Sequence, residues 1–376
     1  MAVVESSTKS DFTTFAVHGG SVVARLAVLD SLRGLAALSV VACHYLILLS
    51  ATPFGRSTSW WLGIPPLSLL RTAYGSVILF FVLSGYVLAL NLMGERRPSW
   101  LGFAARRFCR IWLPFAATIL ISFAIGCISL AENPLLPAIW QANIWQPGTV
   151  TVDALVEQIA MPSIPIGLDL PAWSLVHELR ISLFFPLLFV LVRRAPAVVL
   201  AASLCLNIAV LQAPSWLGQL VPGTAAYIVY FVAGAWLAIN RDRIAELAEA
   251  VNGYAKALIG IVALLLLAVP GDDPRAPVIA GVGAVLMIGL IAASPATVRL
   301  LSAWWCKFLG RISYSLYLTH VVVLMALGSL LGGWLPVSLI LAIAAPIIGL
   351  VAWIGYRCVE RPSIRLGRRL AARFAG

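Results

Sequence analysis

Apolar residues run in long blocks along this chain and do not alternate with polar residues as they do in a membrane β-barrel. A helix needs about 20 mostly apolar residues to cross the hydrocarbon core of a bilayer. Ten blocks reach or approach this length: 34–52, 72–93, 111–131, 171–192, 196–214, 222–240, 255–270, 277–294, 312–332 and 336–356. The pattern therefore predicts an all-α polytopic membrane protein with about ten transmembrane helices.

Composition supports this class. The chain of 376 residues is 61% hydrophobic and 11% charged, with a mean hydropathy of +0.97. A soluble domain carries about 25% charged residues, so a soluble enzyme, a DNA-binding module, a disordered protein and a secreted disulfide scaffold are all poor interpretations. The six cysteines have no CxxC spacing and are expected to be small buried residues, and we expect no metal site.

The net charge of +11 is explained by topology. If the N-terminus is cytoplasmic, most of the 26 lysines and arginines fall in inner connections, as the positive-inside bias requires. This predicts two cytoplasmic termini, contact with membrane lipid headgroups and no nucleic-acid partner. No signal peptide is recognised. We expect a cytoplasmic N-terminal segment at 1–29, a membrane-embedded domain at 30–362 and a basic cytoplasmic tail at 363–376, in the inner (plasma) membrane.

Ionisable residues within a span are costly, so each is a functional candidate. Arg33 and His44 lie about three helical turns apart on one face of the first span, with His44 about 16 Å deeper. A cation above a titratable base suits a long ligand with an anionic head and a reactive end. The alternative is that Arg33 is an interfacial anchor and His44 a core histidine with a satisfied hydrogen bond.

The fourth span carries Glu178 in its outer half, with Trp173, His177 and Arg180 on one face and Ser174 beside Glu178 on the next. A carboxylate at the depth of His44 is expected to orient that imidazole and stabilise its protonated form. The alternative is a local charge neutralisation of Glu178 by Arg180 or His177, although neighbouring residues on a helix face apart.

The ninth span offers a polar stripe of Ser313, Tyr317 and His320 at helical spacing. Such a stripe either joins one helix of a bundle to its neighbours or lines a substrate path. Both interpretations stay open at this point.

Six segments in order resemble the motifs of the acyltransferase-3 family of integral-membrane acyltransferases, over about residues 30–362. They are Asp30–Ala36 with His44, Phe80–Tyr86, Arg106–Ile111 with Pro114, Trp173–Leu175 with Glu178 and Pro186, Gly310 with Ser313, Tyr314, Tyr317, Leu318 and His320, and Glu360–Pro362. Ile181 and Ser182 stand where the family commonly has an aromatic pair.

The resemblance implies transfer of an acyl group, most often acetyl from acetyl-CoA, to a hydroxyl of a carbohydrate or another small acceptor. Acetyl-CoA is then a co-substrate and no bound cofactor is expected. In the family the first-span histidine and the cytoplasmic arginines matter for activity, and here those positions are His44, Arg33, Arg107 and Arg110.

The expected mechanism places the phosphates of acyl-CoA against the arginines and the thioester near His44. His44 is the expected general base, oriented or compensated by Glu178, and a covalent acyl-His44 intermediate is a second route. Ser84 is a candidate to bind the thioester oxygen. The candidates to line the substrate are Ser84, Trp173, His177, Tyr317 and His320.

Two other classes of protein also accommodate buried ionisable groups or a helical membrane bundle. A proton-coupled secondary transporter would use His44, Glu178 and His320 as a relay, but the chain has no internal repeat and no pair of broken spans. A non-catalytic scaffold leaves the buried ionisable groups unexplained. The acidic, Trp-containing loop 132–170 favours an external glycan as acceptor, while a cytosolic small molecule stays open.

Overall fold

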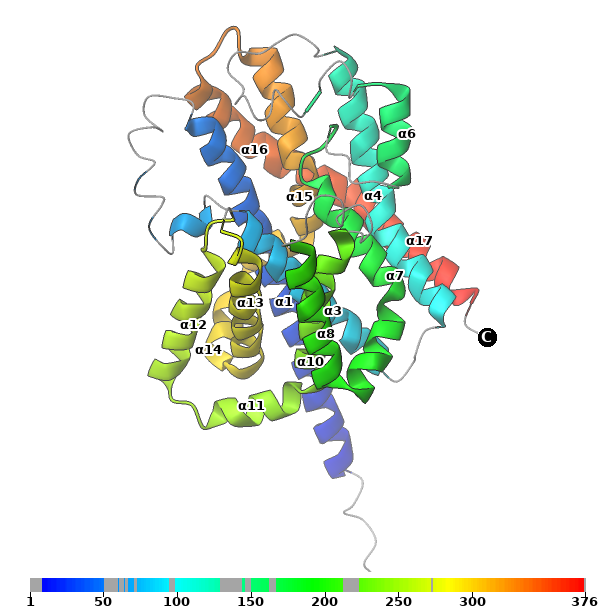
Figure 1. Cartoon of the computed structure of the whole chain (residues 1–376), viewed down its shortest axis with the longest axis vertical. Coiled ribbons are helices and arrows are strands. Elements are labelled where there is room, and N and C mark those ends of the chain that lie inside the picture. Colours follow the sequence, from blue (N-terminus) through cyan, green and yellow to red (C-terminus); the bar gives the residue numbers. More distant parts are fainter. Residues whose placement is uncertain are drawn as a thin grey trace, which may run out of the picture.

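The structure of the chain is a computed structural model that describes residues 9–50, 60, 64, 67–70, 73–94, 99–128, 144–145, 150–161, 167–211, 223–271 and 273–374. Over these residues the regular secondary structure is helical throughout and contains no strand. The predicted all-α class is therefore confirmed (Figure 1).

Six of the ten predicted spans correspond to helices long and apolar enough to cross a membrane. They are the apolar part Ala27–Leu49 of α1 (Lys9–Leu49), α3 (Tyr74–Met93), α4 (Trp100–Ile128), α7 (Ala172–Arg194), α15 (Trp304–Leu331) and the continuous segment Val337–Ala372. This last segment contains α16 (Val337–Gly355), the π-helical turn η4 (Tyr356–Glu360) and α17 (Arg361–Ala372). The described part of the chain thus has six such helices, or seven if one bent pair is a single span, and the predicted number of ten is not confirmed.

The other four predicted spans fall on shorter or bent elements. α8 (Pro196–Leu211) has 16 residues and α12 (Gly253–Leu267) has 15, which correspond to about 24 and 22 Å of helix, less than the ~30 Å hydrocarbon core. α13 (Ala276–Ala293) has 18 residues, which correspond to about 27 Å. The segment Gly223–Ile239 bends by 67° into α11 (Arg241–Glu249). Ten spans and the cytoplasmic placement of both termini therefore stay predictions.

Close backbone contacts hold the centre of the bundle together. α1 packs along α15, and a Cβ on Gly34 would run into the backbone of Leu309 and Gly310. α3 packs in the same way along α10 (Ile228–Ile239), where a Cβ on Gly85 would run into the backbone of Phe231. Small residues at such crossings allow membrane helices to approach closely. These contacts fix the faces that α1 and α15 turn toward each other, and likewise those of α3 and α10.

Shorter elements complete the structure. They are η2 (Leu67–Leu70), α6 (Val152–Ala160), η3 (Gly223–Tyr227) and α14 (Pro295–Leu301). α6 packs against α4, and η3 packs against α7 and α8. α17, at the red end of the chain, runs beside α4 at the edge of the molecule (Figure 1). The C-terminal helix thus covers one side of α4.

Candidate active site

A cavity lies between α1, α3, α4, α7 and α15. Its charged lining residues are three arginines, Arg33, Arg107 and Arg110, and one carboxylate, Glu178. Its other polar lining residues are Ser84, Ser174, Ser313, Tyr314 and Tyr317. The arginines named from the sequence are therefore brought together in one hollow, although they come from helices far apart in the chain.

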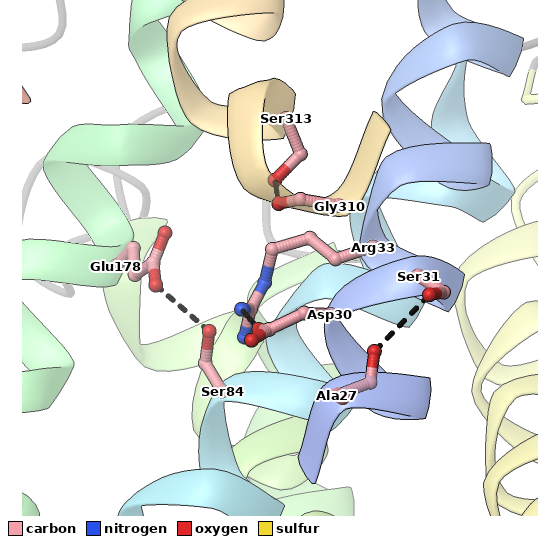
Figure 2. A network of polar contacts seen from close by, with 8 residues as sticks. All are labelled: Ala27, Asp30, Ser31, Arg33, Ser84, Glu178, Gly310 and Ser313. Atoms are coloured by element: carbon pink, nitrogen blue, oxygen red, sulfur yellow. Dashed lines mark hydrogen bonds and ion pairs between the residues drawn. The ribbon is translucent and has the colours of Figure 1, made fainter. Parts of the chain in front are cut away.

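Arg33 reaches into the cavity from α1, and Figure 2 shows it beside Asp30, with Ser84 and Glu178 on the facing helices. Its Nη1 donates to Asp30 Oδ1 at 2.8 Å, and the Arg33 side chain is 16% exposed. The charges that act on Arg33 are those of Asp30, Arg110, Glu178 and Glu360. The ion pair with Asp30 holds the guanidinium without removing its remaining N–H groups from the cavity.

Glu178 is bound to Ser84 and does not form the predicted pair with His44. Ser84 Oγ donates to Glu178 Oε1 at 2.7 Å, from α3 to α7 (Figure 2). The serine proton is therefore committed to the carboxylate, which argues against the expected role of Ser84 as a donor to the thioester oxygen. The prediction that Glu178 orients His44 was wrong, because the two side chains face different helices. The face of α7 that carries Glu178 meets α3, whereas the face of α1 that carries His44 meets α15.

His44 lies against His320 instead. His320 Nε2 and His44 Nδ1 are 3.0 Å apart, and both side chains are buried. His320 Nδ1 lies 3.1 Å from the Leu316 carbonyl oxygen, so this nitrogen carries a proton and Nε2 accepts. His44 Nδ1 therefore donates, shared between His320 and the Val40 carbonyl at 3.0 Å. The hydrogen-bond network assigns the lone pair of His44 to Nε2.

Tyr317 connects the cavity to this histidine pair. Its hydroxyl is 2.8 Å from Ser174 Oγ, and its ring centroid is 6.2 Å from that of His320. Of the polar stripe on α15, Ser313 and Tyr317 line the cavity, whereas His320 lies behind Tyr317 and His44 lies beyond His320. The stripe thus has one substrate-facing part and one part that packs against α1.

Trp173 and His177 are not among the residues that line the cavity, contrary to the prediction. His177 Nδ1 is 2.9 Å from Thr224 Oγ1 of η3, and its ring packs against Tyr227 and Trp173. Their face of α7 is turned toward η3, while the adjacent face with Ser174 and Glu178 is turned toward the cavity. Arg180 donates hydrogen bonds to the Thr224 hydroxyl and to the Met161 carbonyl oxygen. The guanidinium is thus directed to these two groups, and the alternative in which it neutralises Glu178 is not seen among the described residues.

Three further residues near the site received no role from the sequence. Glu360 is buried in the π-helical turn and accepts a hydrogen bond from Ser315 Oγ at 2.7 Å. The tenth span was predicted to end at 356, so Glu360 was placed outside it. Tyr314 donates from the cavity wall to the Ile111 carbonyl at 2.6 Å. Asp169, three residues before α7, has both carboxyl oxygens buried without a hydrogen-bond partner in the described structure, and burial raises the pKa of this carboxyl well above its ordinary value.

The geometry defines a membrane-embedded helical bundle with a cation-lined cavity next to a buried histidine pair. The chain matches the family model described as "Acyltransferase domain", the acyltransferase-3 family, over residues 26–357, and it belongs to this family of membrane acyltransferases. It is 32% identical over 386 aligned positions to a protein named "Acyltransferase MdmB" from Streptomyces mycarofaciens, covering 92% of this chain and 94% of that protein. No solved structure matches the chain. These similarities give no support to the transporter alternative.

Proposed function

We propose that the protein transfers an acyl group, in the first instance acetyl from acetyl-CoA, to a hydroxyl of a carbohydrate or another small acceptor at the inner (plasma) membrane. The observation that carries this proposal is the cavity in which Arg33, Arg107 and Arg110 face a single carboxylate, Glu178. An excess of guanidinium groups in a partly buried hollow favours an anionic ligand, and guanidinium forks suit phosphate oxygens.

The donor would bind with its phosphates on the arginines and its acylated thiol directed along α15. The ion pair with Asp30 fixes Arg33 at the mouth, so part of the cost of ordering this side chain is met before the ligand binds. Glu178 keeps acceptor capacity on its oxygens beyond the bond from Ser84. In this proposal the Glu178 oxygens accept a hydrogen bond from a hydroxyl of the acyl acceptor.

The base would be His44 Nε2, because the hydrogen bond to His320 fixes the proton on Nδ1. His44 takes the proton of the acceptor hydroxyl, the oxygen attacks the thioester carbonyl, and the C–S bond breaks. The departing thiolate takes the proton back from His44, which returns the imidazole to its starting form. His320 replaces Glu178 as the group that orients the base, and a general base of this kind contributes about 10²–10⁴-fold to the rate.

Tyr317 stands between the cavity and the histidine pair, so the proposed reaction requires this side chain to turn when the substrates bind. Direct transfer and a covalent acyl-His44 intermediate predict different products on the protein. Labelled acyl groups trapped on the wild-type protein but not on His44→Ala would favour the covalent route. No trapped label during turnover would favour direct transfer.

The test is release of free thiol from acetyl-CoA by the purified protein with fractionated cell-envelope glycans as acceptors. His44→Ala is compared with wild type, and Tyr45→Phe serves as the matched control because it removes one hydroxyl from the same helix on the side of α16. We expect release by wild type and Tyr45→Phe and a loss of about 10²–10⁴-fold in His44→Ala. Release that is independent of His44 would refute the base, and absence of acetyl-CoA binding would refute the donor.

A further inference from the structure

A second hollow lies where α17 packs beside α4 and the end of α3. It is lined by four arginines, Arg106, Arg107, Arg110 and Arg368, together with Asn91, Phe103 and Ile364. The residues that line it in the described structure include no carboxylate.

A close helix contact builds this hollow and places Arg368 in it. A Cβ on Gly367 would lie 3.0 Å from Cys109 Cβ and 3.1 Å from Arg106 Cα, so a larger side chain at this position would push α17 away from α4. Arg368 follows Gly367 directly and shares the wall of the hollow with Arg106. The approach of the two helices therefore sets two guanidinium groups from distant parts of the sequence around one space.

The arginines of this hollow differ in exposure. Arg106 and Arg368 are exposed, whereas Arg107 and Arg110 are half-buried and also line the first cavity. Within the described part of the chain, neither Arg106 nor Arg368 forms an ion pair or a hydrogen bond with another residue. The two hollows thus share an inner wall of two arginines, and the second adds an outer pair of cations with no protein counter-charge.

We propose that this second hollow binds the nucleotide end of the acyl-CoA donor, with Arg106 and Arg368 holding its 3′-phosphate. The inference rests on the proposed function and adds a phosphate-recognition site to it. A CoA thioester carries a 5′-diphosphate on the pantetheine side and a separate phosphate on the ribose. A diphosphate on the shared Arg107 and Arg110 leaves the ribose phosphate on the outer side, where the two exposed arginines lie.

The arrangement also predicts how each phosphate contributes. The inner arginines contact the part of the donor that leads to the thioester, so they affect both donor affinity and the placement of the acyl group. The outer arginines contact only the distal phosphate, and their contribution is uniform between the bound donor and the transition state. Such a contact changes KM and leaves kcat unchanged.

The experiment compares acetyl-CoA with acetyl-3′-dephospho-CoA as donors for wild type, Arg368→Gln and the matched control Arg365→Gln. Arg365 is an exposed arginine of the same helix that does not line the hollow. We expect Arg368→Gln to raise KM for acetyl-CoA about tenfold, with kcat unchanged, because it loses charge-assisted hydrogen bonds to one phosphate. KM for the dephospho donor should be high in wild type and the same in Arg368→Gln, and Arg365→Gln should behave as wild type with both donors.

Equal KM values for the two donors in wild type, with normal turnover, would overturn this inference and leave the proposed function intact. An equal rise of both KM values in Arg368→Gln would also overturn it, since the arginine would then act without regard to the 3′-phosphate. No thiol release from either donor would overturn the proposed function and the inference with it. Measurements in nanodiscs with and without anionic lipid separate the two sources of phosphate. A donor preference that is lost when anionic lipid is present would assign the hollow to a lipid headgroup, because the headgroup would displace the 3′-phosphate.

Discussion

Replacement of His320 by glutamine tests whether the two histidines act as one unit. The change removes the ring nitrogen that lies 3.0 Å from His44 Nδ1 and keeps a polar side chain at a fully buried position. The base His44 would then no longer be held in the tautomer with its lone pair on Nε2. We expect kcat/KM to fall while donor affinity is retained, because His320 does not line the arginine cavity.

The magnitude follows from the hydrogen bond that is lost. A neutral hydrogen bond contributes about 0.5–1.5 kcal/mol and one to a charged group about 1.5–3 kcal/mol. The rate depends only on how much stronger this hydrogen bond is to the imidazolium of the transition state than to the neutral imidazole of the ground state. That difference is about 1.4 kcal/mol, so His320→Gln should lower kcat/KM about tenfold. Loss of the base itself in His44→Ala should cost about 10²–10⁴-fold.

The assay is thiol release by the two single variants and by the double variant. Because His320 acts only through His44, the double variant should be no slower than His44→Ala alone. Thr319→Val is the matched control, since the Thr319 hydroxyl only bonds the Ser315 carbonyl of its own helix. A double variant about tenfold slower than His44→Ala would show that His320 acts independently and would refute the proposed unit.

Three further predictions concern packing, pH and binding. Gly34→Ala should destabilise the protein by about 1–3 kcal/mol, because the new Cβ meets the backbone of α15. Gly289→Ala, with no atom within 4 Å of the new Cβ, should not lower the melting temperature, because alanine is also the better helix former. Because the pKa of Asp169 is raised in the folded state, this carboxyl stays protonated there while it ionises in the unfolded chain. The free energy of unfolding should therefore fall as pH rises above about 4. The melting temperature of Asp169→Asn should depend less on pH. Arg33→Ala should raise KM for acetyl-CoA with kcat largely retained, and lost turnover at unchanged affinity would refute its phosphate role.

Long apolar spans and single costly residues could be predicted from the sequence. The second predicted span, 72–93, matches α3 (Tyr74–Met93) closely, because a continuous apolar run of this length has only one stable form in a bilayer. Arg33 and Glu178 were found in the same way, since an ionisable group within a span needs a structural or functional reason. Hydropathy did not give the exact length of each helix: the span predicted at 255–270 corresponds to the 15-residue helix α12, because a loop or bend at the end of an apolar run carries little signal in composition.

Side-chain pairing was less predictable than position. Helical spacing placed His177 and Glu178 on adjacent faces, but which face meets α3 and which meets η3 depends on the rotation of α7 in the bundle. That rotation is set by contacts between distant segments. The pairing of His44 with His320 follows likewise from the close approach of α1 and α15 at Gly34 and Gly310, which a single-helix pattern does not contain.

The same close contact links the fold to the proposed chemistry. Gly34 follows Arg33, and Gly310 lies one turn before Ser313 and Tyr314, so the crossing of α1 and α15 sits directly beside the arginine end of the cavity. From this crossing, His44 and His320 each lie about three turns farther along their helices. One contact therefore sets both the site proposed for the phosphates and the distance to the base. A side chain that separated α1 from α15 here would disturb donor binding and the histidine pair together, whereas changes at Arg368 should affect binding alone.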